Sequence, residues 1–213
     1  MNGTGIKFCG LSTPETVDAA IAAKAEFLGF IFFPPSPRYV PPDRAAGLVA
    51  RIPAGTARVA VLVDADDALI DAVLGAGIDT LQLHGTETPE RIAAVRARTG
   101  RPVWRAAGVA TRAEITAAIA GAGAADRLLL DAKAPKGACL PGGNGLAFDW
   151  RLLDGIRLPL SWGLSGGLDA GNVGAALALL RPDFVDVSSG IEDEPGVKSI
   201  AKMRGFAQAV RNA

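Results

Sequence analysis

The sequence predicts an α/β protein: a single barrel of eight parallel strands in which a helix follows each strand. Eight short apolar runs alternate with eight longer stretches of helical period, many of them rich in Ala. Strict alternation of this kind is typical of parallel strands joined by right-handed crossovers. The 213 residues contain no linker and no low-complexity tract, so one domain covers residues 1–213. An open doubly wound sheet is the structural alternative, but eight units favour a closed (β/α)8 barrel, the TIM barrel.

Each predicted strand is a short apolar run bounded by Gly, Pro or polar residues. The eight runs are Ile6–Leu11, Phe27–Phe33, Arg58–Val63, Thr80–His84, Pro102–Ala107, Arg127–Asp131, Leu158–Leu164 and Phe184–Val187. The spacing between them is tight, which places this barrel near the low end of the size range for the fold.

The predicted helices fill the intervals between the strands. Several begin at recognisable start signals, such as Thr13 before Pro14 and the Thr, Pro and Glu of TETPER. The eight helices are Pro14–Lys24, Asp43–Arg51, Asp67–Leu74, the TETPER helix that ends near Thr99, Arg112–Ala120, Asp149–Leu153, Ala170–Leu180 and Ile200–Val210.

Composition excludes several classes of protein. The formal net charge is zero, from 22 basic and 22 acidic residues, so no bulk field favours nucleic acid or an anionic membrane. The single histidine, His84, excludes a metal site with several histidines within one chain. Two cysteines, Cys9 and Cys139, make no disulfide framework and suggest reduced thiols in the cytoplasm. We expect no signal peptide and no membrane span, because the apolar runs are too short.

Polar residues gather at the ends of the first, fourth, sixth and eighth predicted strands. Barrel enzymes form their active sites at this end of their strands. Because side chains alternate along a strand, three pairs each share one face: Lys7 with Cys9, Gln82 with His84, and Asp186 with Ser188. The intervening residues are apolar and suit packing under the helices: Phe8, Leu83 and Val187. Burial of so many polar groups costs stability unless they are paired or wet, so we expect them to line a substrate pocket.

Two of these residues are candidates for acid–base chemistry, and each has a plainer alternative. Cys9 is either a small buried hydrophobe or a thiolate base or nucleophile that needs a positive neighbour such as Lys7. Strands one and eight adjoin in a closed barrel, so Asp186 can pair with Lys7. Asp131 ends the apolar run RLLLD. It is either a turn carboxylate or an acid whose pKa is raised by burial.

Glycine-rich segments follow predicted strands seven and eight, the recurring place for phosphate in barrels. Their candidate phosphate-binding residues are Ser165, Gly166, Gly167, Ser188, Ser189 and Gly190. Two ordinary glycine turns are the alternative. Arg38 lies in the Pro-rich loop after strand two and is either solvated or held over the barrel mouth to bind a carboxylate. We expect His84 to be a polar pocket wall rather than an acid or base, and Cys139 to be incidental.

Seven motifs occur in an order that resembles phosphoribosylanthranilate isomerase along essentially the whole chain. They are IKFCGL, FIFFPPSPRYV, LQLHG, LLLDAK, GGNGLAFDW, LSGGL and DVSSGIEDEPGVKS. The resemblance implies a (β/α)8 barrel and a metal-free, cofactor-free Amadori rearrangement of N-(5-phosphoribosyl)anthranilate to 1-(2-carboxyphenylamino)-1-deoxyribulose 5-phosphate, in tryptophan biosynthesis.

The resemblance also implies roles for individual residues. Cys9 matches the general base, Asp131 the general acid, and Arg38 the arginine that holds the anthranilate carboxylate. The SGGL and SSG segments match the phosphate cradle, and we expect Lys7, Gln82, His84 and Asp186 to bind substrate. We expect the chain to be a monomer or a homodimer.

The sequence departs from the family pattern at Phe8, Asn144 and Ser199, none of which is the proposed acid or base. Three rival hypotheses remain. A ribulose-phosphate epimerase would need metal-binding histidines, and a dual histidine/tryptophan pathway isomerase would need an aspartate in place of Cys9. A catalytically silent phosphate-binding barrel would need the glycine segments but not Cys9 and Asp131 together.

Overall fold

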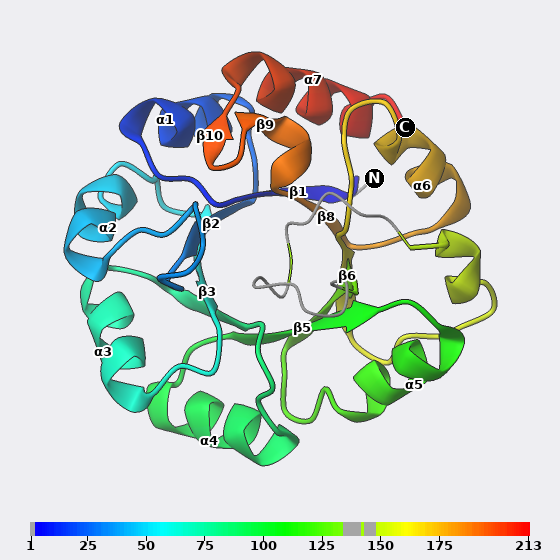
Figure 1. Cartoon of the computed structure of the whole chain (residues 1–213), viewed down its shortest axis with the longest axis horizontal. Helices are drawn as coiled ribbons and strands as arrows, with labels where there is room; N and C mark the ends of the chain where they lie inside the picture. Colours follow the sequence, from blue (N-terminus) through cyan, green and yellow to red (C-terminus); the bar gives the residue numbers. More distant parts are fainter. Residues whose placement is uncertain (1–2, 134–141, 143–147) are drawn as a thin grey trace.

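A computed structural model describes residues 3–133, 142 and 148–213 of the chain. Eight parallel strands close into a barrel in sequence order, with helices on the outside (Figure 1). The strands are β1 (Gly5–Cys9), β2 (Phe27–Ile31), β3 (Ala57–Leu62), β4 (Thr80–Leu83), β5 (Val103–Val109), β6 (Arg127–Ala132), β7 (Ser161–Leu164) and β8 (Phe184–Val187). The pairing of β1 with β8 closes the barrel and excludes the open sheet.

The helices of the outer ring follow the predicted order. They are α1 (Pro14–Ala22), α2 (Pro42–Val49), α3 (Asp67–Gly75), α4 (Pro89–Thr99), α5 (Arg112–Ala120), α6 (Val173–Leu179) and α7 (Ile200–Arg211). Thr13 and Thr88 cap α1 and α4 through their hydroxyls, as their sequence signals predict. No helix in the described part of the chain is long and apolar enough to cross a membrane.

Three predicted elements differ in type or starting point for local reasons, and the other boundaries lie within two residues of their predicted positions. The segment after β6 forms a single 3-10 turn, η1 (Trp150–Leu153), which ends before Gly155 in a left-handed conformation. Strand β7 begins at Ser161 rather than Leu158, because Pro159 has no N–H to donate to a strand ladder. Helix α6 begins at Val173 rather than Ala170. The Asp169 carboxylate accepts hydrogen bonds from the backbone N–H groups of Gly171 and Asn172 and holds this segment in a turn.

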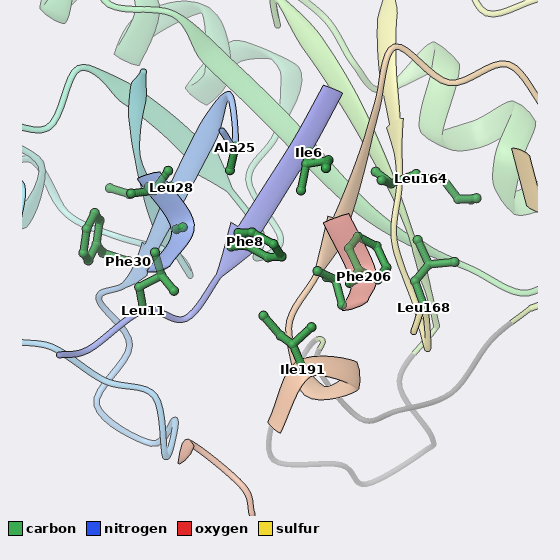
Figure 2. Packing of buried hydrophobic residues seen from close by; sticks show 14 of the residues in the cluster. Ile6, Phe8, Leu11, Ala25, Leu28, Phe30, Leu164, Leu168, Ile191 and Phe206 are labelled. Carbon is green, nitrogen blue, oxygen red and sulfur yellow. The ribbon is translucent and has the colours of Figure 1, made fainter. Parts of the chain in front are cut away.

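Alternation along the strands separates two environments, as predicted. Phe8 faces outward and packs on Phe206 of α7, with ring centroids 6.2 Å apart (Figure 2). Ile6, Leu28 and Leu164 belong to the same buried layer between the barrel and its helices. The residues that alternate with them along each strand point into the barrel. Lys7, on the inner face of β1, is completely buried.

The amino-terminal end of the barrel is closed by a separate cluster. Phe27, Trp104 and Phe184 pack with ring centroids 5.0–5.2 Å apart. The Arg127 guanidinium lies 5.1 Å, 5.4 Å and 5.7 Å from the centroids of the same three rings. Because Arg127 begins β6 and Asp131 lies near its other end, the closed end and the polar end of the barrel are held on the same strand.

A two-stranded hairpin was not predicted. It consists of β9 (Glu192–Glu194) and β10 (Val197–Lys198) and lies between β8 and α7, after a short 3-10 turn, η2 (Ser189–Ile191). Figure 1 shows this hairpin between α1 and α7, on the outer side of β1.

Candidate active site

The carboxyl ends of the strands enclose a pocket with about 760 Å³ of empty space, part of it open to solvent. The predicted site residues that line it are Cys9, Arg38, Gln82, His84, Asp131, Asp186, Ser165, Gly166, Gly167, Ser188 and Ser189. Residues from six different strand ends and loops thus meet around one cavity.

Two predicted site residues lie behind the pocket wall instead of on it. The Lys7 side chain is completely buried, and its Nζ donates to Asp186 Oδ1 at 2.9 Å. Gly190 packs against the SGGL segment so closely that an added Cβ would lie 1.9 Å from Leu168 O. Lys7 and Gly190 therefore support the pocket and do not form its surface.

The pairing of Lys7 with Asp186, expected from the neighbouring positions of β1 and β8, is confirmed. Lys7 pairs in register with Asp186 in the sheet, and their side chains meet inside the barrel. Ser165 Oγ lies 3.4 Å from Asp186 Oδ2 and extends the contact to β7. Burial lowers the pKa of Lys7, but the charges of Asp186 and Cys9 outweigh that effect and raise it, so Lys7 is a cation.

Cys9 ends β1, and its side chain lies within reach of Lys7. Burial raises the pKa of the Cys9 thiol above its ordinary value. The positive charge of Lys7 lowers the same pKa, and the Asp186 carboxylate raises it again. The net shift is upward. Lys7 promotes ionisation of Cys9, as expected, but burial and the Asp186 charge have the larger effect on the Cys9 pKa.

Asp131 has the surroundings of a carboxylic acid that keeps its proton. Burial raises its pKa to about 7, and the nearby Asp186 carboxylate contributes to the same shift. The backbone N–H of Ala132 donates to Asp131 Oδ1 at 2.9 Å and opposes the shift only in part. Near neutral pH a large fraction of Asp131 is protonated and can donate a proton to a bound molecule.

Two polar side chains of β4 and its end face the pocket with atoms that lack partners. His84 Nε2 and Gln82 Oε1 are buried, and neither has a hydrogen bond within the part of the chain that is described. Burial, followed by the charges of Lys7 and Arg105, lowers the pKa of His84 to about 4, so its ring is neutral. Orphaned buried polar atoms are rare in proteins, and here they indicate contacts that a ligand would complete.

The SGGL and SSG segments meet at one side of the pocket. Ser165, Gly166 and Gly167 line it from the end of β7, and Ser188 and Ser189 line it from the end of β8. The N–H groups of Gly166 and Gly167 have no acceptor among the described residues. Ser188 Oγ donates to Cys9 O at 3.2 Å and fixes this side of the pocket to β1. Free amides with hydroxyls are suited to bind an anion.

Arg38 reaches the pocket from the Pro-rich loop, and its side chain is buried rather than solvated. Its guanidinium makes two hydrogen bonds to Glu192 of the hairpin, Nε to Oε1 at 2.7 Å and Nη2 to Oε2 at 2.8 Å. Glu192 also accepts from Lys198 Nζ at 2.6 Å. Sequence reasoning missed Glu192 and Lys198. The Pro-Gly pair at 195–196, a turn signal, is the feature that could have revealed the hairpin.

The loop after β6 carries two sequence predictions that lie outside the described residues. These are the incidental role of Cys139 and the departure from the family pattern at Asn144. Within the described ranges, no group of three or more His, Cys, Asp or Glu side chains is arranged to hold a metal ion.

Comparison with known proteins identifies a family for this chain. The model of the N-(5'phosphoribosyl)anthranilate isomerase family matches residues 6–209. N-(5'-phosphoribosyl)anthranilate isomerase of Azorhizobium caulinodans is 52% identical over 209 residues, which cover 98% of this chain and 92% of that protein. The crystal structure of phosphoribosyl anthranilate isomerase from Thermotoga maritima has a TM-score of 0.88 at 30% identity, covering 99% of this chain and all of that one.

A second solved structure carries a bound molecule. It is a phosphoribosyl anthranilate isomerase in complex with reduced 1-(o-carboxyphenylamino)-1-deoxyribulose 5-phosphate. Its TM-score is 0.83 at 28% identity, and the match covers 99% of this chain and 100% of the other.

Proposed function

The chain belongs to the N-(5'-phosphoribosyl)anthranilate isomerase family, and from this premise we propose how its own residues carry out the reaction. The protein is an isomerase of tryptophan biosynthesis. It converts N-(5-phosphoribosyl)anthranilate to 1-(2-carboxyphenylamino)-1-deoxyribulose 5-phosphate, with Asp131 as general acid and Cys9 as general base. The observation that carries these roles is that Asp131, whose pKa is raised to about 7, and Cys9 line one pocket from β6 and β1.

The first step is ring opening, which Asp131 promotes. Its protonated carboxyl donates a proton to the furanose oxygen while the C1–O bond breaks. The electron pair of the anthranilate nitrogen forms the C1=N bond of a Schiff base. The burial that keeps Asp131 neutral supports this role, because an ionised carboxylate has no proton to give.

The second step is removal of the proton from C2, for which Cys9 is the base. The electron pair of the C2–H bond forms C1=C2 and neutralises the iminium, which gives an enolamine that tautomerises to the ketone. The base must be a thiolate, and Lys7 is the cation beside it. Strands β1 and β6 are separated by β7 and β8 around the barrel, so acid and base act from different sides of the sugar.

Two anion sites hold the ends of the substrate. Arg38 binds the anthranilate carboxylate, for which a guanidinium is well shaped. Ser165, Gly166, Gly167, Ser188 and Ser189 receive the 5-phosphate through amides and hydroxyls, with Gly190 supporting them from behind. Gln82, His84 and Asp186 contact the ribose, and the unpartnered Gln82 Oε1 and His84 Nε2 support this placement.

The setting of the enzyme is also part of the proposal. We place it in the cytoplasm, acting on a small molecule and using neither nucleic acid nor a membrane, as a monomer or homodimer. The neutral net charge and the two unpatterned cysteines support this setting.

A direct assay tests the assignment of the base. Phosphoribosylanthranilate is generated in situ, and the loss of its anthranilate fluorescence is followed with EDTA present. We expect wild-type protein to remove the signal, Cys9→Ala to do so about a hundredfold more slowly or worse, and Cys139→Ala, the matched control, to behave like wild type. Wild-type turnover in Cys9→Ala would remove Cys9 from the mechanism.

A further inference from the structure

Glu192 is a buried carboxylate that no step of the reaction uses. Only 8% of the residue is exposed, and both of its oxygens accept from the Arg38 guanidinium at 2.7 Å and 2.8 Å. A fork of this kind fixes a guanidinium in direction as well as in place. Burial raises the pKa of Glu192, but the hydrogen bonds from Arg38 and Lys198 outweigh it and lower the pKa, so Glu192 remains ionised.

Lys198 makes the cluster cationic as a whole. Its Nζ donates to Glu192 Oε1 at 2.6 Å, to Ser188 O at 3.0 Å and to Ser188 Oγ at 3.2 Å. Burial lowers the pKa of Lys198 below its ordinary value, and the charge and hydrogen bond of Glu192 offset this only in part. With Lys198 protonated, one carboxylate lies between two cations, which leaves a net charge of +1 for Arg38, Glu192 and Lys198 together. Without Lys198, the Arg38–Glu192 pair would be neutral and would attract an incoming carboxylate less.

The hairpin is packed against the loop that carries Arg38. At its turn, Gly196 has a φ of 87°, and an added Cβ would lie 2.6 Å from Pro37 O. Only glycine permits both that backbone conformation and so close an approach. The prolines of the loop and the hairpin turn thus bring Arg38 and Glu192 together from positions 154 residues apart in the sequence.

We propose that Glu192 is a positioning residue that orients Arg38 toward the carboxylate of the substrate, with Lys198 keeping the cluster cationic. The proposal rests on the assignment of Arg38 to the anthranilate carboxylate. It goes beyond that assignment because it gives the β9–β10 hairpin a function: the hairpin sets the direction of the carboxylate-binding group without itself contacting substrate.

Fragment inhibition separates this function from general support of the fold. Glu192→Gln is compared with Glu194→Gln, an exposed carboxylate of the same hairpin. Anthranilate and inorganic phosphate are used as competitive inhibitors, one for each end of the site. We expect Glu192→Gln to raise the inhibition constant of anthranilate, and KM, about tenfold. We expect kcat and the inhibition constant of phosphate to change less than about threefold, because Lys198 keeps its contacts with Ser188.

Two outcomes of this comparison would overturn the proposal. One is an unchanged inhibition constant for anthranilate. The other is an equal loss of anthranilate and phosphate affinity, with or without a lower unfolding temperature, because equal loss indicates a generally disturbed site. Glu194→Gln is expected to match wild type in all of these measurements.

A double-mutant cycle with Arg38→Ala distinguishes this proposal from the assignment of Arg38 to the anthranilate carboxylate, on which it rests. If Glu192 acts through Arg38, adding Glu192→Gln to Arg38→Ala raises KM no further. Additive effects would show that Glu192 acts by another route and would overturn the inference. If Arg38→Ala alone leaves KM unchanged, the assignment of Arg38 to the carboxylate is the part that fails.

Discussion

His84 Nε2 lies 3.5 Å from Asp131 Oδ2, yet the two side chains do not form an ion pair near neutral pH. Burial lowers the pKa of His84 to about 4 and raises that of Asp131 to about 7. Between those values both groups are neutral. The imidazole therefore leaves the Asp131 proton in place, where a charged partner would favour its loss.

The pH dependence of kcat/KM is expected to show that the active enzyme is a minor protonation form, with Asp131 protonated and Cys9 ionised. The reaction needs Asp131 protonated, with a pKa of about 7, and Cys9 ionised, with a pKa raised above its ordinary value. Below pH 7 the thiolate fraction increases with pH. Between pH 7 and the pKa of Cys9, the thiolate fraction still increases, but the protonated fraction of Asp131 decreases by the same factor. We expect kcat/KM to rise to pH 7, to stay level, and to fall only in the alkaline range.

The measurement is kcat/KM in overlapping buffers at constant ionic strength. A profile that falls above pH 7 would indicate the opposite arrangement, in which the Cys9 pKa lies below that of Asp131. That result would mean that Lys7 outweighs burial at Cys9.

Replacement of Asp131 by Asn is expected to lower kcat about a hundredfold or more, the usual contribution of a general acid. Asparagine keeps the shape of the side chain and can still accept from Ala132 N, so only the proton is lost. Asp154→Asn, at an exposed carboxylate after η1, is the matched control and should leave kcat unchanged. The steady-state assay decides. Full activity in Asp131→Asn would transfer the acid role to another group.

The same substitution is expected to stabilise the folded protein at alkaline pH. Because the pKa of Asp131 is raised on folding, from 3.8 to about 7, the folded state binds the extra proton between these values. Its stability therefore falls as pH rises through that window, by an amount on the order of 4 kcal/mol at most. We expect Asp131→Asn to be more stable than wild type at pH 8, and the difference to shrink at pH 4.5.

Urea unfolding at the two pH values tests this expectation. The difference between variant and wild type isolates Asp131, since the other titrating groups are shared. A constant difference across pH would show that Asp131 titrates normally in the fold.

Arg127 is expected to matter for stability and not for turnover. Its guanidinium lies over the rings of Phe27, Trp104 and Phe184 at the closed end of the barrel. Replacement by Met keeps much of the apolar stem and removes the charge, which should lower the free energy of unfolding by about 1–2 kcal/mol. Arg127→Lys should lose less of the free energy of unfolding, because the lysine keeps a positive charge near the rings. Chemical denaturation with parallel kinetics is the test, and a loss of kcat in the folded variant would contradict the separation of the two ends.

The sequence predicted the parts of the site that depend on alternation along a strand. Phe8 and Lys7 follow one another, and opposite faces of the strand placed one among the helices and the other inside the barrel. Pairing of Lys7 with Asp186 followed from the closure of β1 on β8. These features need only the period of a strand and the order of strands in a barrel, both of which local sequence determines.

Features that depend on packing between distant segments were not predictable in the same way. Glu192 contacts Arg38 because the β9–β10 hairpin packs onto the Pro-rich loop. The two hairpin strands contain only five residues together, and they are too short and too charged to show an apolar pattern in the sequence. The direction of the Cys9 pKa shift was also missed. It is the balance of burial and the Asp186 charge, which raise the pKa, against the positive charges of Lys7 and Lys198, which lower it. The degree of burial is set by the assembled barrel rather than by the spacing of Lys7 and Cys9.

The closed amino-terminal end has a consequence for how this protein can change. Arg127 and Asp131 are four residues apart on β6, which corresponds to about 13 Å along a strand. Sites at such a separation that share no partner usually have additive effects. Stabilising substitutions around the three rings should therefore add to the free energy of unfolding without altering substrate preference. That added stability would offset the destabilising effect of substitutions in the loops at the carboxyl ends of the strands, where substrate preference is set.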